Sequence, residues 1–110
     1  MNKYEWALEQ LISQGEVTFK VFGTSMMPLI KTESILTFKK TDDYQVGDVV
    51  FCRVHGNYID AHLVTQIDSK GRYLISNNHG HNNGWTKKVF ARVIAVNGKP
   101  FGRKVSSDES

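Results

Sequence analysis

The stretch VFGTSMMPLI occupies residues 21–30 and holds a serine, Ser25, between two hydrophobic segments. Two methionines follow the serine directly, and Pro28, one of only two prolines in the chain, comes next. A proline restricts the backbone around it and interrupts regular structure, so these residues are expected to form a turn. In such a turn Ser25 is either a nucleophile or a small polar residue that bonds to the local backbone.

Before this stretch the chain changes from a helical to an extended periodicity. Apolar residues within 3–13 follow the i, i+3, i+4, i+7, i+8 spacing of an amphipathic helix, and Gly15 is placed to end it. The segment EVTFKVFG (16–23) then alternates between apolar and polar residues, as a half-buried strand does. The sequence therefore predicts one short helix and a strand that leads into the Ser25 turn.

Five further strand-like segments follow the turn, separated by residues that favour turns. These segments are 34–40, 47–54, 58–67, 72–76 and 89–96. The polar run NNHGHNNG (77–84) is expected to be a long loop between the last two. Six strands after one helix predict a mainly β fold, a small antiparallel barrel or folded sheet. We expect a single domain over residues 1–100 and a flexible tail over residues 101–110.

The amino-acid composition limits the classes of protein to which the chain can belong. The 110 residues are 40% hydrophobic and 23% charged, which is typical of one globular domain. No run approaches the roughly 18 apolar residues of a membrane-spanning helix, and the single cysteine cannot form an internal disulfide. These features favour a cytoplasmic protein without membrane insertion. The net charge of +3 permits nucleic-acid binding but does not indicate it.

Two other kinds of site are less well supported by the sequence. His79 and His81, with Cys52 as a third ligand, could hold a zinc ion, but a second cysteine or a suitably spaced histidine is missing. We therefore expect no metal and no cofactor. Aromatic and basic residues within 73–92 could bind single-stranded nucleic acid, and the modest net charge argues against that function.

A serine hydroxyl becomes an effective nucleophile only when a neighbouring base accepts its proton. Among the four histidines, His62 lies in the middle of the predicted strand 58–67 and not in a loop. Strict alternation would place Tyr58 and Asp60 on the same face as His62, where the Asp60 carboxylate could orient the imidazole ring. The alternative is a half-exposed strand histidine paired with Asp60 or Tyr58 and without a catalytic role.

The blocks GTSMMPLI, VGDVVFCR, DAHLVTQI and GHNNGWTKKVFARVIAV resemble, in order and spacing, the serine peptidases of the signal peptidase I and LexA type. The resemblance covers about residues 20–97. It implies that Ser25 is the nucleophile, that backbone N–H groups of residues 23–25 form the oxyanion hole, and that His62 takes the place of the general base. That base is lysine in bacterial signal peptidases and LexA-like proteins, and histidine in the endoplasmic-reticulum type. The residues implied in the substrate cleft are Gly23, Thr24, Met26, Met27 and Pro28.

The chain departs from the family pattern in the block GHNNGWTKK, where His81 replaces the first acidic residue of a GDNN motif. A carboxylate that would orient His62 is therefore missing from its usual place. The residues that could orient the ring instead are Asp60, His81, Asn82 and Asn83.

Two functions of different classes follow from these patterns. The first is a serine endopeptidase that uses a Ser25–His62 pair and binds its peptide substrate as an added strand beside the cleft. The second is a catalytically degenerate relative that keeps the groove and captures a peptide or protein as a regulatory module. Catalysis requires Ser25 and His62 to lie no more than one water molecule apart unless a loop between them can move, and peptide binding requires an uncovered strand edge beside Ser25.

Overall fold

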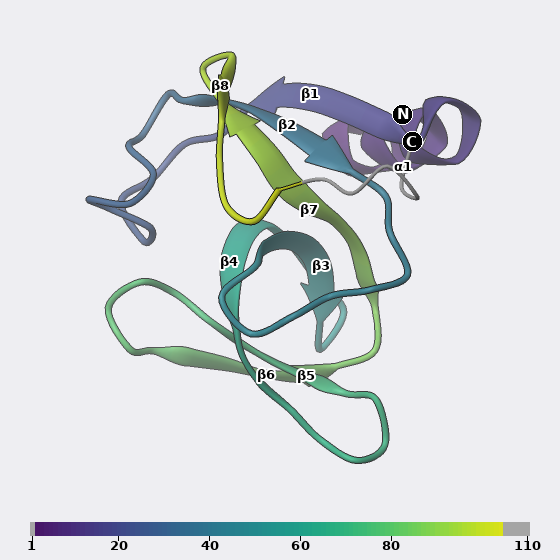
Figure 1. The fold of residues 1–110 in the computed structure, drawn as a ribbon, viewed down its shortest axis with the longest axis vertical. Helices are drawn as coiled ribbons and strands as arrows, with labels where there is room; N and C mark the ends of the chain where they lie inside the picture. The colour runs from purple at the N-terminus through teal and green to yellow at the C-terminus, as the bar shows by residue number, and fades with distance from the viewer. Residues whose placement is uncertain (1, 105–110) are drawn as a thin grey trace.

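The computed structural model describes residues 2–104, which form one helix and eight strands (Figure 1). The elements are α1 (Lys3–Gln14), β1 (Glu16–Lys20), β2 (Ile35–Lys39), β3 (Val49–Val54), β4 (Asn57–Ile67), β5 (Tyr73–Ser76), β6 (Asn82–Thr86), β7 (Val89–Val96) and β8 (Lys99–Pro100). The mainly β architecture with one N-terminal helix confirms the fold class predicted from the sequence.

Helix α1 is bounded by two capping residues, Asn2 at its start and Gly15 at its end. The Asn2 side chain accepts a hydrogen bond from the N–H of Glu5, one of the first-turn donors that have no partner within the helix. Gly15 adopts the left-handed conformation that a glycine reaches without strain, and its N–H donates to the carbonyl of Leu11. The buried face of the helix, with Ala7 and Leu11, packs toward the sheet.

The strands form one antiparallel sheet in the order β1-β2-β7-β3-β4-β5-β6, with β8 paired to β7. The described residues extend over 31 × 30 × 29 Å, so the sheet curls and does not spread as a flat layer. In Figure 1, α1, β1 and β2 lie at one end, β5 and β6 lie at the other, and β3 and β4 pass between them. The two central strands therefore join two halves of the molecule.

Each half has its own hydrophobic core. The first core contains Ala7, Leu11, Val17, Phe19, Val21, Met26, Ile30, Leu36, Phe38, Val49, Phe51, Ala61, Ala91 and Val93. The second core contains Tyr44, Val50, Cys52, Val54, Val64 and Ile75. Successive side chains of a strand point to opposite faces, so β3 supplies Val49 and Phe51 to the first core and Val50 and Cys52 to the second.

Two features of the sheet differ from the expectations drawn from the sequence. Residues 82–86 form β6, which pairs with β5, so the expected loop at 77–84 ends early. Along β4 the pairing with β3 is irregular between Val50 and Cys52. Ile59 consequently packs against the second core while Ala61 belongs to the first, although strict alternation would place both on one face.

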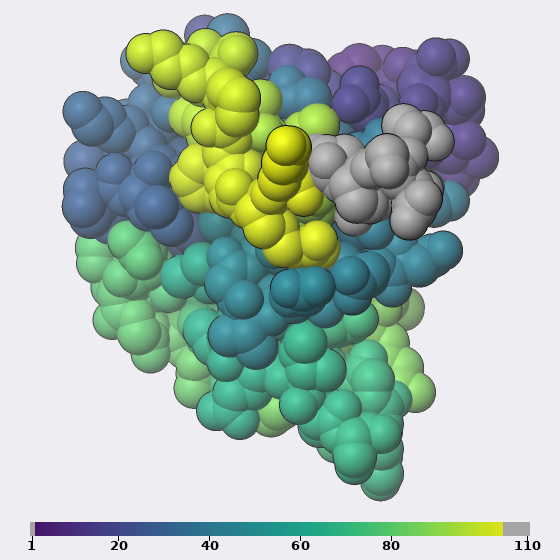
Figure 2. Space-filling view, in the orientation of Figure 1, coloured from purple at the N-terminus to yellow at the C-terminus, as the bar shows by residue number. Residues whose placement is uncertain are grey.

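The first residues of the predicted C-terminal tail make defined contacts. Phe101 packs against the first core, and its N–H donates to the carbonyl of Ile94. The Arg103 guanidinium binds the buried carboxylate of Asp48 at 3.0 Å, in the turn before β3. Figure 2 shows this segment in yellow against the residues that precede β3. Residues 105–110 of the predicted tail lie outside the described residues.

Candidate functional site

The Ser25 turn is anchored by apolar side chains on either side of its tip. Met26 and Ile30 are buried in the first core, and the Ile30 N–H donates to the carbonyl of Met26 at 2.9 Å. The Met27 N–H closes a tighter turn onto the carbonyl of Thr24, and the Met27–Pro28 peptide bond is cis. Ser25 itself is only partly buried, so its hydroxyl sits on an anchored segment and remains accessible.

The structure brings Ser25 and His62 into contact. The Ser25 Oγ lies 3.1 Å from Nε2 of His62, which projects from β4. On the other side of the ring, Nδ1 lies 2.9 Å from Oδ1 of Asn83 on β6. An amide oxygen only accepts hydrogen bonds, so Nδ1 carries the proton and the Nε2 lone pair faces the serine hydroxyl. This is the tautomer in which a histidine can accept a proton from serine.

The environment of His62 keeps its ring neutral near pH 7. Burial, the largest influence, lowers the pKa of His62 below its usual 6.5, and the nearby His81 lowers it further. The hydrogen bond to Asn83 and the negative charge of Asp60 raise the pKa, but burial outweighs them. A neutral imidazole is the form that a general base requires.

The β5–β6 hairpin also holds the backbone of the Ser25 turn. The Asn78 N–H donates to the carbonyl of Ser25 at 2.8 Å, and the Asn78 side-chain amide donates to the carbonyl of Met27 at 3.2 Å. Nε2 of His79 lies 3.1 Å from the carbonyl of Thr24, to which it can donate. The hairpin that supplies Asn83 to the histidine therefore also positions the serine.

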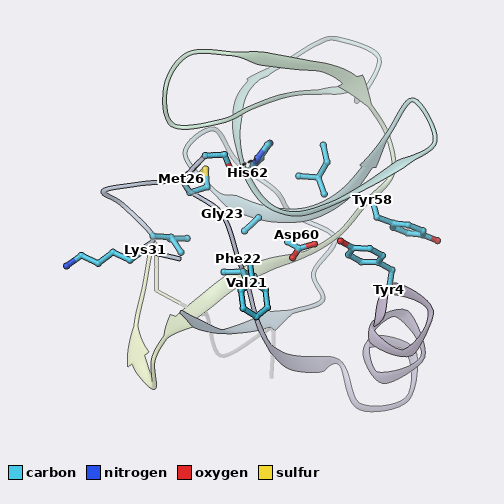
Figure 3. Close-up of a pocket in the computed structure, with 13 residues that line it drawn as sticks. Tyr4, Val21, Phe22, Gly23, Met26, Lys31, Tyr58, Asp60 and His62 are labelled. Atoms are coloured by element: carbon cyan, nitrogen blue, oxygen red, sulfur yellow. Dashed lines mark hydrogen bonds between the residues drawn. The ribbon is translucent and has the colours of Figure 1, made fainter. Parts of the chain in front are cut away.

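A cleft of about 290 Å³ runs along these residues (Figure 3). Residues 21–23 form one wall and residues 58–62 form the other, with Ser25 and His62 between them. Tyr4 of α1 reaches the end of the cleft, where its ring stacks on that of Tyr58 with centroids 4.9 Å apart. The side chain of Lys31, which is also at the cleft, points away from it in Figure 3.

Of the four residues considered as partners of the His62 ring, Asn83 is the one that forms a hydrogen bond with it. The Asp60 carboxylate binds Lys3 Nζ at 2.9 Å, and Oδ1 of Asn82 accepts a hydrogen bond from the Ser76 hydroxyl. His81 donates its backbone N–H to the side chain of Asn77. Asp60 and His81 thus influence His62 through their charge and do not orient its ring by contact.

The residues expected in the cleft divide into two groups. Gly23 and Met26 line it together with Ser25, whereas Thr24, Met27 and Pro28 are not part of its lining. The backbone carbonyls of Thr24 and Met27 serve instead as acceptors for the β5–β6 hairpin.

Several residues of the site carry no signal in the sequence. Tyr4 lines the cleft and Lys3 binds Asp60, which also lines it, through contacts between the start of α1 and β4 that join residues more than 50 positions apart. Asn78 and His79 lie in the polar run that looked like a plain loop, and only its length and its asparagines set it apart. Their role in holding the Ser25 turn depends on the folding of the hairpin.

Neither a metal site nor a membrane-spanning helix is found in the part of the chain that the structure describes. Among residues 2–104 no three His, Cys, Asp or Glu side chains are grouped to hold a metal ion. Cys52 lies in the second core, where burial raises its pKa to about 12, while His79 bonds to the Ser25 turn. No helix in the same range is both long and apolar enough to cross a membrane.

The comparisons with known proteins point to one family. The family model described as Peptidase S24-like matches residues 2–99, a range that includes Ser25, His62 and Asn83. No curated protein and no solved structure matches the chain. The match confirms the resemblance to the signal peptidase and LexA group that the sequence blocks indicated.

Proposed function

Because the chain belongs to the Peptidase S24-like family, we propose that it is a serine endopeptidase in which Ser25 is the nucleophile and His62 the general base. The observation that carries this proposal is the 3.1 Å contact between Ser25 Oγ and His62 Nε2. The pKa of His62 is below 6.5, chiefly because the ring is buried, and its tautomer leaves the Nε2 lone pair toward the serine. Both features favour proton transfer from Ser25 at neutral pH.

The reaction has two halves. In the first, His62 accepts the Ser25 proton as Oγ bonds to a peptide carbonyl carbon, and the carbonyl oxygen becomes an oxyanion. His62 then gives the proton to the leaving amine nitrogen, the C–N bond breaks, and an ester on Ser25 remains. In the second half, His62 removes a proton from water, the hydroxide displaces Ser25 from the ester, and the proton returns to the serine oxygen.

Backbone amides close to the nucleophile are the candidates for the oxyanion hole. The Gly23 N–H donates to Oγ1 of Thr32 at 3.0 Å, so this donor is already engaged. Within residues 2–104 the Ser25 N–H donates no hydrogen bond, which leaves it available for an oxyanion beside Oγ. We therefore assign the Ser25 amide to this role and not the Gly23 amide.

A peptide can add to the cleft as an extended strand. The pairing of β4 with β5 begins at Leu63, and in the described part of the chain residues 57–62 pair only with β3. On the opposite wall, residues 21–23, the Val21 N–H donates to the carbonyl of Ser34 and its carbonyl accepts from Glu33. The β4 wall of the cleft thus presents an unpaired backbone edge beside Ser25, which supports strand addition as the mode of substrate binding.

The test is covalent labelling with a serine-reactive phosphonate, read by intact mass. We expect one adduct on the wild type at pH 8, none on Ser25→Ala, and a much slower reaction on His62→Ala. Ser13→Ala, which alters an exposed serine on α1, is the matched control and should label at the wild-type rate. A wild type that remains unlabelled while folded by circular dichroism contradicts the proposal and favours a peptide-binding module.

A further inference from the structure

Two side chains beside His62 together have the properties that one acid supplies in a serine–histidine–aspartate triad. Asn83 contacts Nδ1 of the ring but carries no charge, whereas Asp60 is charged but bonds to Lys3. In a triad the carboxylate both orients the ring and stabilises the imidazolium that forms. We propose that this protein divides the two tasks: Asn83 orients His62, and Asp60 supplies negative charge within the cleft at a strength set by Lys3. The inference rests on the proposed function.

The orienting role belongs to Asn83 because its position is set by the strand geometry. β6 pairs with β5 through Ser76–Asn82 and Ile75–Gly84, and the register shifts between them, at the level of Asn83. The next residue, Gly84, has a φ of +135°, a backbone conformation in which a residue with a side chain would be strained. The backbone on either side of Asn83 is therefore constrained, and its Oδ1 is held toward the ring.

The charge-supplying role belongs to Asp60 because of its place in the cleft. Asp60 precedes His62 by two residues on β4, lines the same cleft, and keeps 22% of its side chain exposed. A partly buried carboxylate interacts more strongly with a nearby imidazolium than one in bulk water would. Figure 3 shows Asp60 between His62 and the tyrosines at the end of the cleft.

Lys3 moderates this charge and is itself firmly held. Its Nζ binds Asp60 at 2.9 Å, donates to the carbonyl of Lys20 at 3.0 Å and lies 4.5 Å from the centre of the Phe19 ring. Burial and a hydrogen bond with Asp60 raise the pKa of Tyr4 to about 12, so Tyr4 stays neutral beside the same carboxylate.

The other groups around His62 do not supply negative charge. His81 acts in the opposite direction and lowers the pKa of His62, while Asn83 is neutral. Lys31 reaches the cleft from the Ser25 segment but points away from it in Figure 3. Among the described groups that influence His62, Asp60 is the anionic one.

The test measures the pKa of His62 by NMR titration and the phosphonate labelling rate in the same variants. We expect Asp60→Asn to lower the pKa of His62 and Lys3→Met to raise it. The labelling rate at pH 8 should fall about two- to fivefold in Asp60→Asn and rise by a similar factor in Lys3→Met, the size typical of a partly screened charge. Asp68→Asn, which alters an aspartate paired with Arg72, is the matched control and should change neither quantity.

Asn83 is tested by two substitutions with opposite outcomes. Asn83→Ala should release the Nδ1 proton from its fixed position, seen in the ¹⁵N shifts of the ring, and slow labelling about a hundredfold. Asn83→Asp joins both tasks in one residue, so it should raise the pKa of His62 and speed labelling about tenfold or more. It should also make the rate insensitive to Asp60→Asn.

The results separate this inference from the proposed function. An unchanged pKa of His62 in both Asp60→Asn and Lys3→Met, or an unchanged tautomer in Asn83→Ala, overturns the division of roles. If the pKa and tautomer respond as expected but no variant labels, the division of roles stands and the peptidase assignment fails. Opposite pKa shifts from Lys3 and Asp60 cannot arise from a general loss of structure.

Discussion

The two cores of this protein share β3 and β4 but contribute differently to the candidate site. The first core is rich in aromatic rings and anchors the Ser25 turn through buried Met26 and Ile30. The second core is smaller and supports β5, and through it the hairpin that carries Asn83. His62 lies on β4, between the two. The site is thus assembled where the cores meet, and its geometry depends on how they are joined.

The largest effect on the free energy of unfolding is expected from a substitution at the centre of the first core. The Phe51 ring is fully buried and packs against five other aromatic rings, Tyr4, Phe19, Phe38, Tyr58 and Phe90. Phe51→Ala should lower the free energy of unfolding by about 3–5 kcal/mol, measured by urea denaturation. Phe22→Ala, at a side chain that is 67% exposed, is the matched control and should cost less than about 0.5 kcal/mol. Similar losses in both variants would show that the first core does not dominate stability.

The second core offers a smaller perturbation that tests whether the halves unfold together. Ile75→Ala should cost about 2–4 kcal/mol, since it removes a fully buried side chain, while Ile12→Ala at an exposed site should cost little. Trp6 on α1 and Trp85 on β6 report on the two halves separately when the other is replaced by Phe. Because β3 and β4 belong to both cores, we expect coincident transitions. Separate transitions would mean two independent units.

A still smaller effect on stability is expected at the start of α1, which brings Tyr4 to the cleft and Lys3 to Asp60. Asn2→Ala should lower the free energy of unfolding by about 1 kcal/mol because the Glu5 N–H loses its acceptor. Asn2→Ser keeps an accepting oxygen and should remain close to the wild type in urea denaturation. If both substitutions have equal effects, the cap does not contribute through this hydrogen bond.

The pH dependence of stability tests the region between the cores. Burial lowers the pKa of His62 in the folded protein, so below about 6.5 the unfolded chain binds a proton more readily than the folded one. The contribution of His62 to stability is therefore fully present above pH 6.5 and is lost as the pH falls toward the lower folded pKa. His62→Gln should reduce the loss of stability between pH 7.5 and 5.5, compared by urea denaturation. An unchanged pH profile would contradict burial as the cause.

Much of the fold follows from local patterns that the sequence displays. The helix at Lys3–Gln14 follows from its apolar spacing and from Gly15, and the alternating runs correspond to strands. β6 was missed because its residues, NNGWT, include two asparagines and a glycine, which favour turns over strands when judged alone. Its strand conformation comes from pairing with β5, an interaction that local propensity does not encode.

The candidate site likewise contains residues that the sequence indicates and contacts that only the structure decides. Ser25 and His62 could be proposed from the sequence, because a serine before Met-Met-Pro and a histidine within a predicted strand match the nucleophile and base positions of the family pattern. The sequence alone does not show that Asn83, and not Asp60 or Asn82, is the residue that hydrogen-bonds to the His62 ring. The irregular pairing of β4 and the register shift of β6 decide which side chain meets the ring.

The sequence by itself determined a mainly β fold, its helix and most of its strands, and a serine and a histidine that could act together. The tertiary structure decided the partner of that histidine, the edges that line the cleft, and the approach of Lys3 and Tyr4 to Asp60. The physical reason is the separation along the chain over which each kind of interaction acts. Periodicity and turn preference act between neighbours along the chain, whereas the site joins residues 3, 25, 60, 62 and 83 through strand register, a bulge and the packing of two cores.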